Sequence, residues 1–383
     1  MNNFLFNAIL IVCFAATGYA GEYKVPLSKL APVASVDLRC TQDQYEIAVP
    51  VPERWKVTRA VLTLDYINSA SLISDRSHLI VAMNGSPLAQ IRLDRKAPAG
   101  RKRIEAPPAL LKPGYNTLLI TAVQHYAAEC GQVCAPNLWT TVNLHDSTLE
   151  LSYDLKPVPP RLSALSDFLF DPKIMPQGDV HMVTGPLTSD NATMAAIAAA
   201  GIARKFDYRK ALFSVSQELV PGRDNVLIAD KQYVESFLRQ RGVTLTVTGP
   251  YLKILPLPLL SGGTDPGYAL LVVSGKNAEE IKLASKTLAH LSLPFPGSDD
   301  MLVREFKLPD ISQYGGRQVL TTDKVYTLKM LNFGSHTFAG FNPSPRHISF
   351  RLPADFLVKP NQYAKLNLNF AYGAGMRIDS VMN

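Results

Sequence analysis

The chain has 383 residues, of which 47% are hydrophobic and 19% are charged, and its formal net charge is +7. This length predicts two or three domains, and the hydrophobic content excludes a mainly disordered protein. The positive charge is dispersed except for one cluster around a turn at residues 98–100, made of Arg92, Arg95, Lys96, Arg101, Lys102 and Arg103. Such a cluster could meet an acidic partner or lipid surface, or form a solvated hairpin tip.

Residues 1–20 are typical of a secretory signal peptide. An apolar run covers residues 4–16, which is too short to span a bilayer comfortably, and small residues follow it up to Ala20. We therefore expect cleavage after Ala20, export from the cytoplasm and an oxidising compartment. After residue 20, no stretch of the sequence is long and apolar enough to cross a membrane.

Three cysteines remain once the signal peptide is removed: Cys40, Cys130 and Cys134. Their odd number predicts one disulfide and one remaining thiol, and the sequence alone does not give the pairing. A bridge between Cys130 and Cys134 would close a local loop, whereas a bridge from Cys40 would tie the first strand to that loop. The second pair of ligands that a structural zinc site needs is missing, so we expect no metal.

Residues 21–156 predict a β-sandwich of the jelly-roll kind. Turn residues separate short apolar segments, and Asn84-Gly85 is typical of a tight hairpin. The expected strands cover residues 62–66, 79–83, 88–93, 117–123, 138–144 and 149–153. One loop between these strands gathers His125, Tyr126 and two cysteines, with Trp139 just after it. This loop is either a binding site or a cross-linked part of the core.

A proline-rich stretch at residues 156–160 predicts a stiff linker, and residues 161–310 then alternate between strand and helix patterns. The expected strands are 180–183, 213–215, 225–229 and 268–273, and the expected helices are 192–205, 232–241 and 277–290. Asp190 or Asn191 can cap the first helix, and Gly242 can end the second. This alternation predicts a flavodoxin-like α/β domain with a parallel sheet.

The α/β region lacks the usual nucleotide-binding motifs, since neither G-x-G-x-x-G nor G-x-x-x-x-G-K-[ST] occurs in the chain. Its one glycine pair, Gly262-Gly263, precedes a strand, so no helix N-terminus follows to receive a phosphate. We therefore expect a scaffold domain without a cofactor, and we expect no nucleic-acid partner.

The β pattern returns near residue 318 and repeats the first domain. Residues 62–66 have a counterpart at residues 366–372, and residues 51–55 have one at residues 352–356. Residues 318–383 therefore predict the start of a second β-sandwich. Half a sandwich cannot bury its inner face, so we expect this segment to be poorly stable alone and the chain to be a fragment or a truncated product.

The order of these motifs resembles the periplasmic regulatory B subunit of bacterial cellulose synthase (the BcsB family). The resembling segments are residues 57–66, 77–85, 108–116, 125–130, 138–139, 168–171 and 350–355. The resemblance implies carbohydrate-binding-like β domains that alternate with flavodoxin-like domains in a non-catalytic periplasmic protein. It implies two partners, the membrane-embedded catalytic subunit and the nascent β-glucan that the protein guides.

The resemblance also implies attachment to the inner membrane by a C-terminal helix, which is missing from this chain. Members of the family are described as binding cyclic di-GMP. The chain contains no R-x-x-x-R motif with a D-x-S-x-x-G partner, so no recognisable motif marks a direct site for this dinucleotide.

Glucans are recognised by aromatic rings that stack on the apolar faces of the sugars. The candidates for such stacking, each of which could instead pack in the core, are Tyr66, Tyr126, Trp139 and Trp55. A glycosidase needs two facing carboxylates, and no spacing pairs Glu129 with Asp146. No G-x-S-x-G motif occurs either, so no catalytic residue is expected. The alternative function is a secreted carbohydrate-active enzyme or a free lectin that uses a jelly-roll module.

Overall fold

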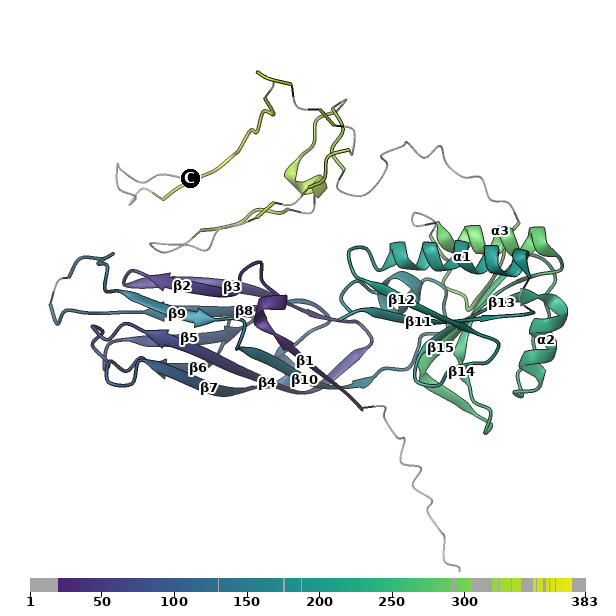
Figure 1. Ribbon diagram of the computed structural model, residues 1–383, viewed down its shortest axis with the longest axis horizontal. Helices are drawn as coiled ribbons and strands as arrows, with labels where there is room; N and C mark the ends of the chain where they lie inside the picture. Colours follow the sequence, from purple (N-terminus) through teal and green to yellow (C-terminus); the bar gives the residue numbers. More distant parts are fainter. Residues whose placement is uncertain are drawn as a thin grey trace, which may run out of the picture. The chain divides into compact units, whose positions relative to one another are not determined.

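The computed structural model describes residues 20–304 except 130, 175, 187 and 291–293, together with several segments further on. Those segments are residues 319–322, 324–331, 333–338, 347–348, 350–353, 356–357, 359–361 and 363–373. Cys130 and residues 1–19 of the predicted signal peptide lie outside the described residues. The described residues up to 304 belong to one compact unit, and most of those from 319 onwards belong to a second (Figure 1).

The first domain consists of two antiparallel sheets, A and B, that pack face to face (Figure 1). Sheet A has the order β1–β10–β4–β9–β2, with β7 paired to β4. Its strands are β1 (Ala20–Pro26), β2 (Ser35–Arg39), β4 (Trp55–Asn68), β7 (Ala99–Ala106), β9 (Trp139–Asn143) and β10 (Thr148–Leu155). Sheet B has the order β3–β8–β5–β6, formed by β3 (Gln42–Val51), β5 (His78–Met83), β6 (Ser86–Arg92) and β8 (Gly114–Val123). Two short 3-10 helices, η1 (Leu27–Lys29) and η2 (Pro108–Leu110), lie between strands.

The core of this domain lies between the sheets, because alternate residues of each strand point inward. Leu62 and Leu64 of β4 share one hydrophobic cluster with Leu118 and Ile120 of β8, and each is at most 1% exposed. Full burial of such a side chain stabilises a fold by about 1.5–3 kcal/mol. Burial of the inward-facing side chains of each strand is therefore the main interaction that holds the two sheets together.

Each strand predicted in this domain is present, but the sequence patterns do not predict β1, β2, β3 or β7. The interpretation of the basic cluster as a hairpin tip is wrong in part. Arg92 ends β6, and residues 101–103 lie on β7, at the edge of sheet A. Charged side chains are tolerated on an edge strand because they reach water, and they also discourage pairing with another chain.

The second domain is built on sheet C, with the order β12–β11–β13–β15–β14–β16. The first four strands run parallel, and β14 is antiparallel to both of its neighbours. The strands are β11 (Gly178–Thr184), β12 (Ala211–Ser216), β13 (Asp224–Asp230), β14 (Tyr251–Pro258), β15 (Thr264–Gly275) and β16 (Asp300–Leu302). The helices are α1 (Ser189–Lys205), α2 (Lys231–Arg239) and α3 (Ala278–Ala289), preceded by a short π-helix, η3 (Leu165–Leu169).

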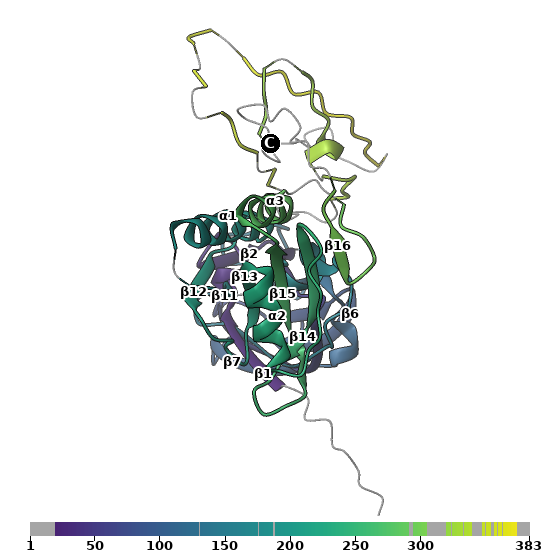
Figure 2. The same ribbon diagram turned by 90° about the vertical axis from the view of Figure 1, so that its right-hand side faces the viewer.

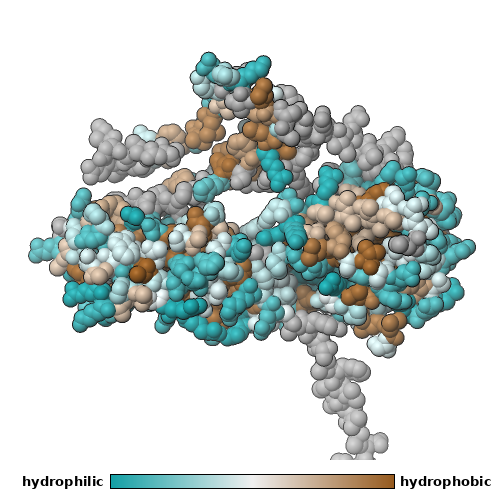
Figure 3. Space-filling model, in the orientation of Figure 1, coloured by the Kyte–Doolittle hydropathy of each residue, from teal (hydrophilic) through white to brown (hydrophobic). Residues whose placement is uncertain are grey.

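Helices α1 and α3 cover one face of sheet C, and α2 covers the other. Figure 2 shows α1 and α3 side by side. Their close approach depends on a glycine, since a Cβ on Gly201 would lie 2.2 Å from the Cα atom of Ala289. The outward side of α1 is rich in alanine, with Ala192, Ala196 and Ala200 exposed, and Figure 3 shows it as a pale apolar patch.

The predicted strands and helices of this domain are present, with two differences. Thr188, not Asp190 or Asn191, is the N-cap of α1, and its side chain accepts a hydrogen bond from the backbone N–H of Asn191. The sequence patterns also do not predict the short strand β16, nor β14, where Pro256 and Pro258 make the segment look unlike a strand. Gly242 has a φ of 75°, in agreement with its predicted role at the end of α2.

The described residues from 319 onwards contain little regular structure. They include a short 3-10 helix, η4 (Leu328–Leu331), and an isolated parallel bridge between Val319 and Arg351. Large hydrophobic side chains are exposed here, among them Val325, Leu357, Tyr363, Leu366, Phe370 and Tyr372. A second sandwich at residues 318–383 stays a prediction.

Candidate carbohydrate-binding site

The loop that gathers His125 and Tyr126 is held at one end of the sandwich by backbone hydrogen bonds. The N–H of Ile73 donates to the carbonyl of His125 at 2.7 Å, and the N–H of Ser69 donates to the carbonyl of Trp139 at 3.1 Å. The Nδ1 atom of His125 lies 2.9 Å from the carbonyl oxygen of Arg76. His125 therefore bonds to the backbone of the neighbouring loop.

A disulfide joins Cys40 to Cys134 and ties this loop to the end of β2. Beside it, the N–H of Thr41 donates to the carbonyl of Val133 at 2.8 Å. Gln124 is fully buried and donates from Nε2 to the carbonyls of Leu38 and Cys40, at 3.1 Å and 3.0 Å. The sequence leaves the pairing of the cysteines open. In the structure, Cys40 after β2 is bonded to Cys134 of the loop.

Tyr126 is half-buried, and the loop folds over its ring. The ring packs against the sandwich core, and its hydroxyl accepts a hydrogen bond of 2.8 Å from the N–H of Gln132. A Cβ on Gly131 would come within 3.0 Å of the ring, so residue 131 sits directly on it. The Tyr126 ring and hydroxyl therefore help to hold residues 131 and 132 of the loop in place.

Tyr66 and Trp139 lie on opposite faces of sheet A. Ile67 is paired with Thr141, and Thr141 lies two residues from Trp139, so all three side chains lie on the same face. Tyr66 comes directly before Ile67 and therefore points to the opposite, inner face. The ring of Tyr66 packs against the core and over Gly100, where an added Cβ would be 2.4 Å from the ring. The structure therefore does not bring the two rings into one platform.

The other tryptophan is part of the core. Trp55 is 6% exposed and stacks on Tyr153, with ring centroids 3.9 Å apart and an angle of 10° between the rings. In contrast, Trp139 is half-buried on the outer face of sheet A, opposite Arg39. Trp139 is therefore better placed than Trp55 to stack on a sugar.

Two exposed tyrosines lie where the two domains meet, and neither is among the candidates predicted from the sequence. Tyr115 at the start of β8 is 59% exposed, and Tyr208 after α1 is 56% exposed. Their hydroxyl oxygens are 3.0 Å apart, and the guanidinium of Arg209 lies 4.8 Å from the centre of the Tyr208 ring. Burial and the hydrogen bond to Tyr208 raise the pKa of Tyr115 above its ordinary value. Tyr115 occupies an outward position of its strand, but its pairing across 93 residues has no local signal.

A buried ion pair also joins the two domains. Arg54 and Asp224 are 5% and 6% exposed, and Nη1 of Arg54 lies 2.6 Å from a carboxylate oxygen of Asp224. The Nη2 atom of Arg54 donates to the carbonyl of Gly267 at 2.7 Å, and the N–H of Ala269 donates to Asp224 at 2.9 Å. Burial alone would lower the pKa of Arg54, but the Asp224 carboxylate, together with Tyr268 and Tyr153, raises it above its ordinary value.

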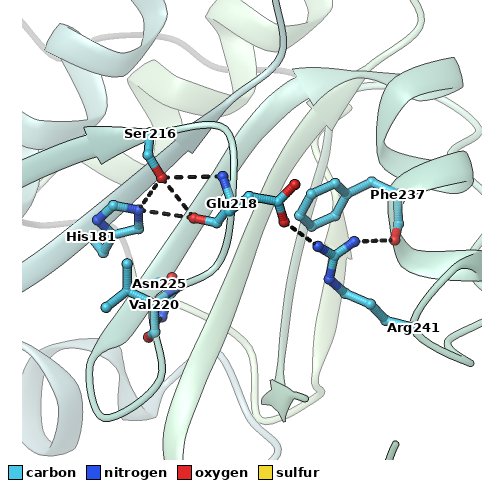
Figure 4. A network of polar contacts seen from close by, with 7 residues as sticks. All are labelled: His181, Ser216, Glu218, Val220, Asn225, Phe237 and Arg241. Carbon is cyan, nitrogen blue, oxygen red and sulfur yellow. Dashed lines mark hydrogen bonds and ion pairs between the residues drawn. The ribbon is translucent and has the colours of Figure 1, made fainter. Parts of the chain in front are cut away.

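A polar network around His181 connects β11 to β12, the edge strand of sheet C (Figure 4). His181 is 2% exposed, with Nδ1 2.8 Å from the Ser214 hydroxyl and Nε2 2.9 Å from the Ser216 hydroxyl. Its Nε2 is also 3.0 Å from the carbonyl of Glu218, so Nε2 carries the proton and Nδ1 accepts. The Glu218 side chain continues the network to Arg241. The Ser216 hydroxyl is bonded to both backbone groups of Glu218, which makes this Ser–His contact structural in character.

Lowering the pH from about 7.5 to about 5 is expected to destabilise the chain through His181. Burial lowers the pKa of His181, and Arg223 adds to this effect. The unfolded state then binds the proton more readily, so stability present above the ordinary pKa of 6.5 is lost as the pH falls. Urea unfolding at several pH values measures the loss, which should be smaller for His181→Gln. The matched variant of an exposed histidine, His145→Gln, should follow the wild type, and equal pH dependence in all three proteins would contradict this account.

The described part of the chain shows no group of three or more His, Cys, Asp or Glu side chains that could hold a metal ion. Of the two carboxylates near the loop, Asp146 accepts a hydrogen bond from the side chain of Asn143. Among the described residues, no helix has both the length and the apolar character needed to cross a membrane.

Three family models match the chain in succession. The first carbohydrate-binding (CBM) domain of cellulose synthase BcsB matches residues 20–155, the first FD domain matches residues 161–301, and the second CBM domain matches residues 325–383. The chain belongs to the BcsB family.

Curated relatives match most of the chain. A cyclic di-GMP-binding protein of Salmonella typhimurium is 26% identical over 378 residues, which cover 96% of this chain and 47% of the relative. Cellulose synthase 2 of Novacetimonas hansenii is 27% identical over 318 residues, which cover 80% of this chain and 19% of the relative. The chain thus spans about half the length of the first relative, and less of the second.

A family 35 carbohydrate-binding module from Clostridium thermocellum also matches the structure. The match covers 32% of this chain and 90% of the module, with 14% identity and a TM-score of 0.18. This likeness is too weak to support a conclusion about the site.

Proposed function

We propose that the chain acts as a non-catalytic periplasmic subunit of a bacterial cellulose synthase, which supports the catalytic subunit and guides the nascent β-glucan. The observation that carries this proposal is the succession of three BcsB domain matches across residues 20–383. Two of these domains are of the carbohydrate-binding kind, which suits a protein that contacts a glucan without cleaving it. A relative of the chain is named a cyclic di-GMP-binding protein, and this name supports including regulation by cyclic di-GMP in the proposal.

Within this proposal, the middle domain is flavodoxin-like and serves as a scaffold. Its parallel strands lie in the order second, first, third and fourth, as in flavodoxin-like folds. The buried pair of Arg54 and Asp224 links the middle domain to the sandwich. A glucan bound to one domain would therefore keep a fixed position relative to the other. Association with the inner membrane is part of the same proposal.

Two of the aromatic residues predicted from the sequence are kept as proposed sugar contacts. Trp139 lies half-buried on the outer face of sheet A, and Tyr126 lies in the loop at the end of the sandwich. Tyr66 packs on the core and over Gly100, an arrangement that argues against stacking on a sugar.

Affinity electrophoresis through a gel that contains a soluble cellulose derivative separates this function from that of a secreted carbohydrate-active enzyme. The chain is expected to be retarded by the β-glucan and not by an α-glucan such as soluble starch. Incubation with the same β-glucan should release no new reducing ends, because the proposed subunit binds without hydrolysis. Release of reducing ends would instead support a secreted carbohydrate-active enzyme, and equal retardation by both glucans would contradict selective β-glucan binding.

A further inference from the structure

The pair of Tyr115 and Tyr208 has the exposure of a ligand site and lacks the packing of a core contact. More than half of each side chain is open to solvent, and neither residue belongs to the hydrophobic clusters of the described residues. The 3.0 Å contact between the hydroxyls fixes the two rings relative to each other. Arg209, whose guanidinium lies by the Tyr208 ring, donates from Nε to the carbonyl of Pro172 at 2.8 Å. Because Arg209 is itself anchored, it limits the movement of that ring.

The outer face of sheet B continues from Tyr115 as a strip of aliphatic and threonine side chains, here called the aliphatic strip. After Tyr115, the outward residues of β8 are Thr117, Leu119, Thr121 and Val123, all half-buried. The strip widens onto β5, where Ala82 is paired with Leu119 and Ile80 with Thr121. Because ten residues of a strand extend over about 33 Å, the strip along β8 is long enough for several sugar rings of an extended chain.

Polar side chains border the aliphatic strip on both sides. On β3, Gln44 is paired with Thr121 and Glu46 with Leu119. On β6, Gln90 is paired with Ile80 and Arg92 with His78. A face with a largely aliphatic centre that includes two threonines, and with hydrogen-bonding margins, matches an extended pyranose chain, whose ring faces are apolar and whose hydroxyl groups point sideways.

We propose that the outer face of sheet B, beginning at the Tyr115–Tyr208 pair, is a binding track for an extended β-linked glucan. This inference rests on the proposed function and names the surface that carries out the guiding. The two tyrosines stack on sugar rings at one end of the track, and the strip on β8 and β5 holds the chain that continues from them. Because one ring comes from each domain, the glucan contacts both domains at this end.

Affinity electrophoresis of the whole chain in a hydroxyethylcellulose gel tests the track. The double variant Tyr115→Ala/Tyr208→Ala is expected to bind about ten-fold more weakly, since it loses two stacking rings. The variant Tyr115→Phe/Tyr208→Phe keeps both ring faces and is expected to retain most of the binding. Leu260→Ala, at a hairpin residue that is 79% exposed, should bind like the wild type. All variants should unfold at nearly the wild-type temperature, because the altered side chains are exposed.

The outcomes separate this inference from the proposed function. Wild-type binding by the alanine double variant, or an equal loss in the alanine and phenylalanine variants, would overturn stacking at the pair. Release of reducing ends by the wild type would refute the non-catalytic function and would leave the track standing. Absence of retardation for the wild type would overturn the track and glucan binding together.

Discussion

Replacing Arg54 by methionine is expected to lower the free energy of unfolding of the chain by about 3–5 kcal/mol. The substitution leaves the carboxylate of Asp224 buried at 6% exposure with no cation to compensate its charge. It also removes the hydrogen bond from Arg54 to the carbonyl of Gly267. Urea unfolding followed by tryptophan fluorescence measures the effect, because Trp55 is adjacent to residue 54 and reports on the junction.

Two further variants make this prediction specific to the buried pair. The double variant Arg54→Met/Asp224→Leu should recover most of the lost stability, since no charge is then left buried. Arg39→Met removes one partner of the Asp37 ion pair, in which the two side chains are 61% and 47% exposed. Because surface pairs are screened by water, that change should cost less than about 1 kcal/mol. Equal effects of Arg54→Met and Arg39→Met would show that the pair does not hold the junction.

Serine at both Cys40 and Cys134 is expected to lower the free energy of unfolding by about 2–5 kcal/mol. The bridge connects residues 94 positions apart, and removing such a cross-link gives the unfolded chain more freedom. The hydrogen bonds of Gln124 and Thr41 nearby keep the same loop in place. The variant is therefore expected to retain the native fold at low denaturant and to unfold earlier in a urea titration.

A reducing agent supplies the matched control for this variant. Dithiothreitol should bring the unfolding midpoint of the wild type down to that of the double serine variant, and it should leave the variant unchanged. Since Cys130 has no second cysteine within the first domain of this variant, no replacement bridge forms there. Coincident unfolding curves for the oxidised wild type and the variant would contradict a stabilising role for the bridge.

The sequence predicts those parts of the fold in which periodicity is strong and turn residues are regular. Residues 62–66 alternate between apolar and polar side chains, residues 118–123 form an almost continuous apolar run, and both segments lie in observed strands. The prediction fails for β7, where Arg101 and its basic neighbours hide an edge strand, and for β14, where two prolines lie near a register shift. Local rules miss such strands because pairing with neighbours, and not the residue pattern, decides them.

The predicted binding residues show a different limit. In the sequence, Tyr66 and Trp139 are both candidates either for stacking on a sugar or for packing in the core, and only the strand register places them on opposite faces of sheet A. The pairing of Tyr115 with Tyr208 spans 93 residues and crosses two domains, so no local motif reveals it. The same holds for the choice of Cys134 as the partner of Cys40. Contacts of this range depend on how whole domains meet.

Co-expression with a membrane-embedded catalytic subunit of a cellulose synthase tests the proposed function directly. The chain carries an affinity tag and is purified from detergent-solubilised membranes, and a full-length BcsB relative is treated in parallel. The account predicts that the catalytic subunit elutes with the tagged chain in comparable amounts. If the full-length relative retains the catalytic subunit and this chain elutes without it, the proposed role as a supporting subunit is contradicted.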